Sequence, residues 1–291
     1  MDQPSAPKPD KHLATFAAML EVPGLLADIF PPALQITAIV IPAQPTGWLS
    51  LWQSRLDRLV GEVGAQLPAH DDESAAERFA RFGRHLFQER GFSGNLAAYA
   101  DPRNSCLTEV LERRLGIPIT LSVLAIAIGR RLGMKVHGVA APGHFLTALE
   151  VEPGRRVFMD PFNRGQLVHL DEARERVRAY AGNVDLDVCD HFLRPASPRD
   201  ILARMLQNLK NSYALQEDME GLLRTLDWLL VVQPANVAEI RNRGLLLLRM
   251  GDFARAVRDL AFYIHHAPEA DDSELIRAEL RRAMTAKARN N

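Results

Sequence analysis

The spacing of apolar residues predicts that the first third of the chain is largely helical. Residues 49–67 and 73–89 carry apolar side chains three and four positions apart, which is typical of amphipathic helices. An apolar stretch over residues 12–30 also favours a helix, and Pro31 ends it because proline lacks an amide hydrogen. The run LQITAIVIP at 34–42 predicts either a short strand or a buried segment, since periodicity alone does not distinguish them.

A central buried helix is predicted after a turn-rich loop over residues 92–104. Asn104 or Ser105 is expected to cap a helix that runs to Leu115. Pro118 suits the first turn of the next helix, and Gly133 suits its end. This second helix is apolar nearly all round, so we expect it to be buried on every side.

The pattern then changes to a period of two, which predicts strands at 135–140, 144–151 and 156–160. Pro-Gly pairs at 142–143 and 153–154 separate these strands and favour tight turns. A further helix is expected over 171–180. A buried helix that leads into an antiparallel sheet predicts an α+β domain.

The C-terminal part of the chain repeats itself with a period of 34 residues. The motifs VVQP and HHAP end 34 residues apart, and the turn Glu217-Asp218 aligns with Gly251-Asp252. One copy has Gly244, Ala256 and Pro268 at positions that resemble the small-residue and proline positions of a tetratricopeptide (TPR) repeat. The other copy keeps Leu209, Tyr213 and Pro234. The period predicts stacked helix pairs capped by a helix over 273–288, with two unrelated helical hairpins as the alternative.

Composition and charge exclude several classes of protein. The chain has 35 basic and 36 acidic residues, so it lacks the positive charge that attracts nucleic acids. Its apolar runs are too short to cross a membrane, and residues 1–12 carry prolines and charges typical of a disordered tail. Two cysteines exclude a disulfide framework, and we expect a cytoplasmic protein. The histidines are too scattered to predict a metal site, and no motif indicates a cofactor.

The segment from Gly116 to Asn163 resembles the transglutaminase-like core, which is related to the papain-type thiol enzymes. The resemblance rests on Leu132-Gly133 at a helix end, the strand HFLTALEV and the motif FMDPF. It implies that His144 is the catalytic histidine and Asp160 the acid that orients it. In such enzymes the imidazole takes a proton from a thiol, and the acid fixes the orientation and tautomer of the ring.

The thiol of that enzyme class is missing from this chain. Counting back from Gly133 puts Pro118 at the position where the superfamily has its cysteine, and proline cannot act as a nucleophile. Thr120, Ser122 and Cys106 are the remaining nucleophile candidates. Their alternative roles are hydrogen bonding at the helix start for the two hydroxyls and a buried, inert thiol for the cysteine. Cys189 is likewise expected to be a buried thiol.

The turn at residues 153–154 allows a test of the His144–Asp160 pair. A hairpin centred there pairs residues whose numbers add to 307, so His144 faces Asn163 and Asp160 faces Thr147. Side chains alternate along a strand, so this register puts His144 and Asp160 on opposite faces. A β-bulge would bring them together; without one, Asn163 would be the partner of the histidine.

More narrowly, the chain resembles the bacterial SirB-type family, in which a transglutaminase-like domain precedes TPR repeats. The motifs are YADPRNSCLTEVLERRLGIPITLSVL, APGHFL and DPFNRG. We therefore expect a tail (1–12), a papain-related transglutaminase-like domain (13–194) and TPR-like helices (195–291). The expected function is non-catalytic binding or assembly of a peptide or protein partner, with a regulatory role open. The alternative is an amide hydrolase or acyltransferase of the cysteine or serine/threonine type, with His144 as base.

Overall fold

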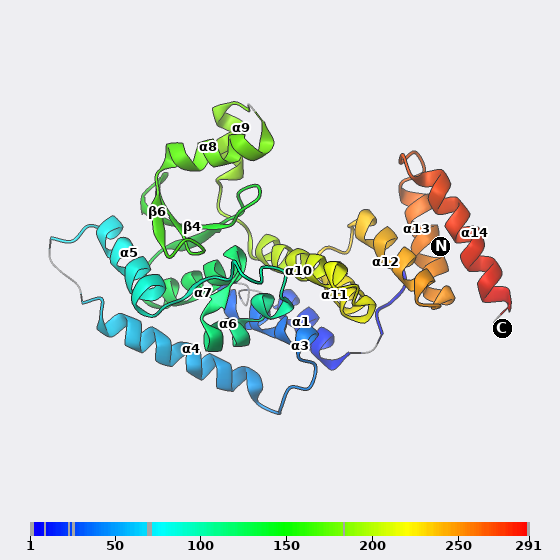
Figure 1. The fold of residues 1–291 in the computed structure, drawn as a ribbon, viewed down its shortest axis with the longest axis horizontal. Coiled ribbons are helices and arrows are strands. Elements are labelled where there is room, and N and C mark those ends of the chain that lie inside the picture. The colour runs from blue at the N-terminus through cyan, green and yellow to red at the C-terminus, as the bar shows by residue number, and fades with distance from the viewer. Residues whose placement is uncertain are drawn as a thin grey trace. The chain divides into compact units, whose positions relative to one another are not determined.

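The structure is a computed structural model that describes residues 3–8, 10–22, 24, 27–68, 72–182 and 184–289. The chain forms two compact units. The core unit comprises residues 19–205, and the helical unit comprises residues 1–18 together with 206–291 (Figure 1). Both α1 (Lys11–Glu21) and α10 (Pro198–Leu215) contribute residues to each unit.

The core unit begins with helices, as the apolar spacing predicts. The helical segments that precede the sheet are α2 (Phe30–Gln35), α3 (Thr37–Val40), α4 (Trp48–Ala65), α5 (Ala75–Gly83), a π-helical segment (Arg84–Glu89), a 3-10 helix (Pro102–Ser105), α6 (Leu107–Arg113) and α7 (Pro118–Arg131). Two short strands, β1 (Ser93–Gly94) and β2 (Leu115–Gly116), pair in parallel between them.

Helix α7 is the central helix of the core unit, as predicted. Every residue from Pro118 to Gly129 is buried, and α7 contacts β3 and β4 as well as α2, α4 and α6. Pro118 occupies the first helical position, where the missing amide hydrogen of proline costs nothing. Gly133 follows the helix with a φ of +80°, a left-handed conformation that favours glycine.

The sheet of the core unit is an antiparallel meander in the order β3-β4-β5-β6. Its strands are β3 (Val136–Val139), β4 (Leu146–Glu152), β5 (Arg155–Asp160) and β6 (Gln166–Val168). The sequence predicts the first three of these, but β6 is too short to show a period. Helices α8 (Leu170–Ala181) and α9 (Leu186–Phe192) cover one face of the sheet, and α7 lies on the other (Figure 1).

The register of the β4–β5 hairpin differs from the predicted one by a single residue. Next to the turn, Glu152 pairs with Arg155, as the sum of 307 requires. A bulge between Glu150 and Glu152 then shifts the ladder, so that Thr147 pairs with Met159 rather than with Asp160. This shift puts Asp160, at the end of β5, on the same face of the sheet as Leu146 and Ala148, because side chains alternate along a strand. His144 reaches Asp160 from the turn before β4.

Of the two alternatives for residues 34–42, the buried segment is the one found, since they lie mainly in α2 and α3 and are largely buried. Three other predictions about local structure are corrected. The helix predicted over 12–30 does not extend to Pro31: α1 ends at Glu21, and Pro31 lies in the first turn of α2. The single helix predicted for 73–89 divides into α5 and the π-helical segment. Neither Asn104 nor Ser105 caps α6: both lie in the 3-10 helix, and Cys106 is the cap residue, without a hydrogen bond from its side chain to the helix start.

The helical unit contains the repeated helix pairs that the period of 34 residues predicts. Its other helices are α11 (Met219–Val232), α12 (Val237–Arg249), α13 (Phe253–His266) and α14 (Ser273–Arg289). The turns of the two copies match in conformation, since Glu217 and Gly251 both have positive φ, at +56° and +81°. Asp218 and Asp252 then cap α11 and α13 with the same hydrogen bond to the backbone three residues on.

Part of the N-terminal segment differs from the disordered tail expected for residues 1–12. Lys11 and His12 belong to α1, and Ser5 is only 3% exposed because it contacts Asp259 of α13. Residues 1–18 therefore join the C-terminal helices, which a division of the chain at 194 and 195 does not anticipate. Among the described helices, none is both long and apolar enough to cross a membrane.

Candidate functional site

His144 lies at the turn that leads into β4. Its amide donates to the carbonyl of Ala141 at 3.1 Å, and the preceding Gly143 has a φ of +69°, which closes the turn. A side chain at Gly143 would collide with the ring of Tyr180 on α8. The imidazole is 22% exposed, so it faces solvent while its position is fixed by the turn.

Asp160 is the buried partner of His144. The Nε2 atom of His144 lies 2.9 Å from Oδ1 of Asp160, whose side chain is fully buried at the end of β5. An ionised carboxylate only accepts hydrogen bonds, so Nε2 carries the proton. In the neutral ring Nδ1 is then a hydrogen-bond acceptor, and within the described ranges no residue donates to it.

Four other groups hold the carboxylate of Asp160. Asn163 Nδ2 and Arg176 Nη1 donate to Oδ2 at 2.7 and 2.8 Å. The backbone amides of Phe162 and Asn163 donate to Oδ1, each at 3.2 Å. Asn163 therefore supports the acid and does not take its place as partner of the histidine.

The hydrogen bonds to Asp160 keep it ionised despite its burial. Burial alone would raise the pKa of this carboxyl, but the hydrogen bonds from His144, Asn163 and Arg176 outweigh it and lower the pKa to about 2. Asp160 is therefore ionised near neutral pH.

Phe162 links the histidine to an exposed aromatic surface. Its ring meets that of His144 edge-on with centroids 6.1 Å apart, and meets Tyr99 edge-on at 6.0 Å. The backbone of Gly94 lies directly against Phe162, so a Cβ atom at position 94 would come within 2.4 Å of the ring. Tyr99 is 48% exposed, so its ring extends the apolar surface of Phe162 to the solvent.

The candidate nucleophiles all have hydrogen-bond partners other than His144. Cys106 is fully buried with its Sγ 3.8 Å from the carbonyl of Pro102, and burial raises the pKa of its thiol far above the ordinary range. Thr120 donates to the carbonyl of Asn104 at 2.8 Å, and Ser122 to that of Phe145 at 3.4 Å. Cys189 is buried near the carbonyl of Arg174.

Arg176 is a site residue that the sequence analysis missed. It lies on α8 and donates to both Asp160 and Glu172. Arginines recur along this helix at 174, 176 and 178, and no local pattern distinguishes the one that reaches Asp160. For the part of the chain that the structure describes, no group of histidine, cysteine or acidic residues could hold a metal ion.

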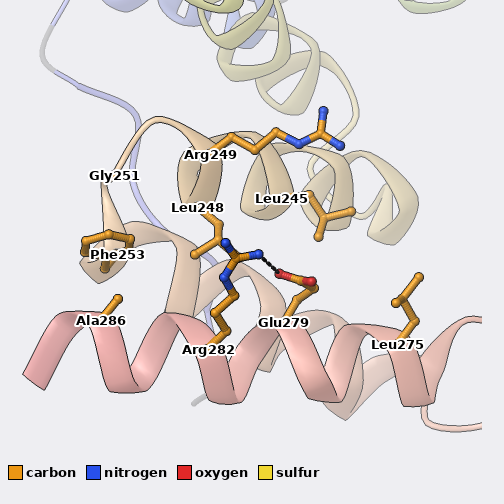
Figure 2. A pocket seen from close by; sticks show the side chains of 9 residues that line it. All are labelled: Leu245, Leu248, Arg249, Gly251, Phe253, Leu275, Glu279, Arg282 and Ala286. Carbon is orange, nitrogen blue, oxygen red and sulfur yellow. Dashed lines mark ion pairs between the residues drawn. The ribbon is translucent and has the colours of Figure 1, made fainter.

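A second candidate site is a groove in the helical unit, between α12 and α14 (Figure 2). Its volume is about 700 Å³, and its apolar lining is Leu245, Leu248, Phe253, Leu275 and Ala286. Figure 2 shows Arg282 paired with Glu279 on α14, while Arg249 extends from α12. Arg249 has no ion-pair partner among the described residues, so the rim of the groove carries an unneutralised positive charge.

Comparison with known proteins defines the class of this chain. A family model described as the transglutaminase-like superfamily matches residues 50–207, and a tetratricopeptide-repeat model matches residues 209–281. The protein is thus a transglutaminase-like protein with a TPR module, which confirms the predicted α+β fold class followed by TPR helices.

Similar sequences from other bacteria identify the family more narrowly. A "UPF0162 protein" of Xylella fastidiosa is 41% identical over 205 residues, covering 70% of this chain and 73% of the relative. Another from Vibrio cholerae is 31% identical over 85% of this chain and 89% of its own length. "Protein SirB1" of Salmonella typhimurium is 29% identical over 81% and 85%. This chain belongs to the family of SirB1 and the UPF0162 proteins, as the SirB-type motifs indicate. No solved structure matches it.

Proposed function

We propose that the protein binds a segment of a partner protein in the groove between α12 and α14, and thereby acts in binding or assembly. The main observation that supports this proposal is that the groove has an exposed apolar lining next to a positive charge without an ion-pair partner. Leu275 at one end of the groove is 63% exposed, and Arg249 at its rim has no ion-pair partner in the described chain. TPR helices are interaction modules whose stacking forms extended binding surfaces, which supports this use of the groove.

The lining of the groove favours an apolar segment with acidic residues. Burying apolar side chains of the partner against Leu245, Leu248 and Leu275 contributes about 25 cal/mol per Å² removed from water. A carboxylate beside Arg249 would form a charge-assisted hydrogen bond of the bidentate kind that arginine favours. A basic segment would bring like charges together at the rim.

The His144 site serves binding rather than bond cleavage in this proposal. Pro118 stands where the resemblance puts the attacking thiol, and it starts α7 as a buried residue. The unengaged Nδ1 of His144 and the ring of Phe162 offer a hydrogen-bond acceptor and an apolar contact to an extended peptide.

Selection of displayed peptides on the intact chain tests the groove. We expect enriched peptides to combine apolar residues with Asp or Glu. Leu275→Glu and Arg249→Glu should each weaken their binding at least tenfold, because the first puts a charge on the apolar lining and the second reverses the rim charge. Leu215→Glu and Arg258→Glu are matched controls on exposed residues of the same unit outside the groove, and should change affinity less than twofold. Equal loss in control and groove variants would contradict the proposal.

The second candidate function is an amide hydrolase or acyltransferase with His144 as base. The distance of 2.9 Å between Nε2 and Asp160 favours it, since a thiol enzyme orients its histidine in this way. Its nucleophile would be Cys106, Thr120 or Ser122, each of which would have to leave a carbonyl partner.

Thiol labelling separates the two functions. Iodoacetamide at pH 7 should label Cys106 and Cys189 slowly, because both are fully buried. Rapid labelling of Cys106 in the unaltered chain that depends on His144 would instead support the enzyme.

A further inference from the structure

Residues 3–8, which we call the N-terminal strap, contact the helical unit chiefly through one residue. Ser5 is 3% exposed, whereas Gln3, Ala6, Pro7 and Lys8 are all exposed. The strap carries no helix or strand of its own. It is therefore held like a bound peptide, at a single buried position.

The helical unit contacts mainly the backbone of Ser5. The amide of Ser5 donates to Oδ1 of Asp259 at 2.7 Å, and its carbonyl accepts from Nη2 of Arg243 at 2.6 Å. The hydroxyl adds only a longer contact with the same Nη2, at 3.1 Å. Any residue except proline presents the same amide and carbonyl, so the contact needs a small side chain more than it needs a serine.

The helices alone do not provide a hydrogen-bond acceptor for every N–H group of the buried Arg243, which pairs with Asp259. Arg243 of α12 is 2% exposed and donates through Nε and Nη2 to Asp259, and through Nη1 to Asp227. Each Nη atom of a guanidinium carries two hydrogens, so one hydrogen of Nη2 remains for an acceptor from elsewhere. A buried donor without an acceptor costs free energy, and the carbonyl of Ser5 supplies that acceptor.

We propose that Arg243 and Asp259 form a recognition site for an extended peptide, which the strap occupies within the same chain and a partner segment can take over. The occupant is a small residue flanked by prolines, as Ser5 is by Pro4 and Pro7. Prolines hold such a segment extended before it binds, which lowers the entropy lost on binding. The inference deepens the proposed function and rests on it only for the existence of a partner.

A partner segment can replace the strap because both reach the site at similar effective concentrations. A segment joined to its site by a few residues has an effective concentration in the millimolar range. A second segment of a partner that is already bound in the groove would reach a similar effective concentration at this site. Arg243 and Leu245 lie two residues apart on α12, about 200° around the helix, so the strap leaves the groove open.

Single substitutions at Ser5 in the intact chain test this site. Ser5→Pro removes the amide that donates to Asp259, and Ser5→Ala keeps it. We attach a nitroxide spin label at the exposed position 3 (Gln3→Cys), since both native thiols are buried. The label should become as mobile as on a free peptide in Ser5→Pro and stay as immobile as in the unaltered chain in Ser5→Ala. The acetylated peptide QPSAPK should then bind the Ser5→Pro chain at least tenfold more tightly than either of the other two, with QPPAPK as the non-binding control peptide.

Each other outcome overturns the proposal. A mobile label in Ser5→Ala would make the hydroxyl, not the backbone, the recognised group. Equal binding of QPSAPK to all three chains, or none to Ser5→Pro up to about 10 mM, would remove the site. Failure of the proposed function is distinguishable, because Leu275→Glu should abolish selection of groove peptides and leave QPSAPK binding unchanged.

Discussion

At the scale of single residues, the sequence identifies the histidine and the acid but not the groups that hold them. His144 and Asp160 stand in motifs that a resemblance can find. Their hydrogen bond depends on a β-bulge near residue 151. The residue types at that position do not predict a bulge. Arg176 is fixed by how α8 packs on the sheet, a tertiary property that a single helix pattern does not contain.

The stability of the site should depend on pH through Asp160. Its folded pKa of about 2 lies below its usual 3.8, so the ionised carboxylate stabilises the fold above pH 4 and that contribution disappears as the pH falls toward 2. The shift corresponds to about 2 kcal/mol. Asp160→Asn should therefore be less stable by about that amount at pH 7, and the difference should shrink at pH 2.5 in urea unfolding followed by circular dichroism. A difference that is constant with pH would contradict the assignment.

At the scale of elements, a regular spacing of apolar residues predicts helices and strands correctly. Segments whose structure is set by their packing against the rest of the fold are not predicted. The central helix α7, the hairpin strands and the 34-residue period follow from apolar spacing and turn residues. The segment at 34–42 is rich in Ile and Val, yet it forms α2 and α3, because burial against the rest of the core overrides intrinsic preference. The π-helical turn at 84–89 has no sequence signal of its own.

Introducing a glycine in one turn and removing the glycine from the matching turn should have different effects on the free energy of unfolding. Glu217 has a φ of +56°, a strained conformation for a residue with a Cβ, whereas Gly251 at +81° has no such strain. Glu217→Gly should leave the free energy of unfolding unchanged or raise it by up to about 1 kcal/mol, and Gly251→Ala should lower it by about 1 kcal/mol.

Gly61→Ala is the control for that pair. Gly61 lies within α4 with open space around its Cβ position, so alanine there should stabilise the protein by about 0.5–1 kcal/mol. Denaturant titration of all three variants checks the signs. A Gly251→Ala chain as stable as the parent would mean that the turn relaxes away from its left-handed conformation.

At the scale of the whole molecule, the division into units does not follow the linear order of the chain. The sequence predicts a domain boundary between residues 194 and 195. Contacts between residues more than 200 positions apart add residues 1–18 to the helical unit, since Ser5 bonds to Asp259 and Phe16 stacks on Trp228 at 4.7 Å. Such pairings are invisible to local patterns, so the membership of residues 1–18 in the helical unit could not be predicted.

Phe16→Ala should therefore destabilise the helical unit, although residue 16 lies near the N-terminus. Phe16 is fully buried, and removing a buried phenyl ring costs about 3–5 kcal/mol. With Trp48 and Trp52 replaced by phenylalanine, Trp228 fluorescence reports unfolding of this unit, and its midpoint in urea should fall. Phe79→Ala, in the core unit, should instead lower the midpoint reported by Trp48 and Trp52 in a Trp228→Phe chain. The reverse pattern would contradict the division.

The close approach of Gly94 to Phe162 has a consequence for the history of the family. A methyl group at position 94 would lie within 2.4 Å of the phenyl ring, which itself borders the imidazole of His144. We therefore expect the two positions to be coupled: alanine at position 94 requires the ring at position 162 to move away or to be replaced by a smaller side chain. Homologous sequences should show these two sites changing in step, while Gly61, with open space around it, drifts freely.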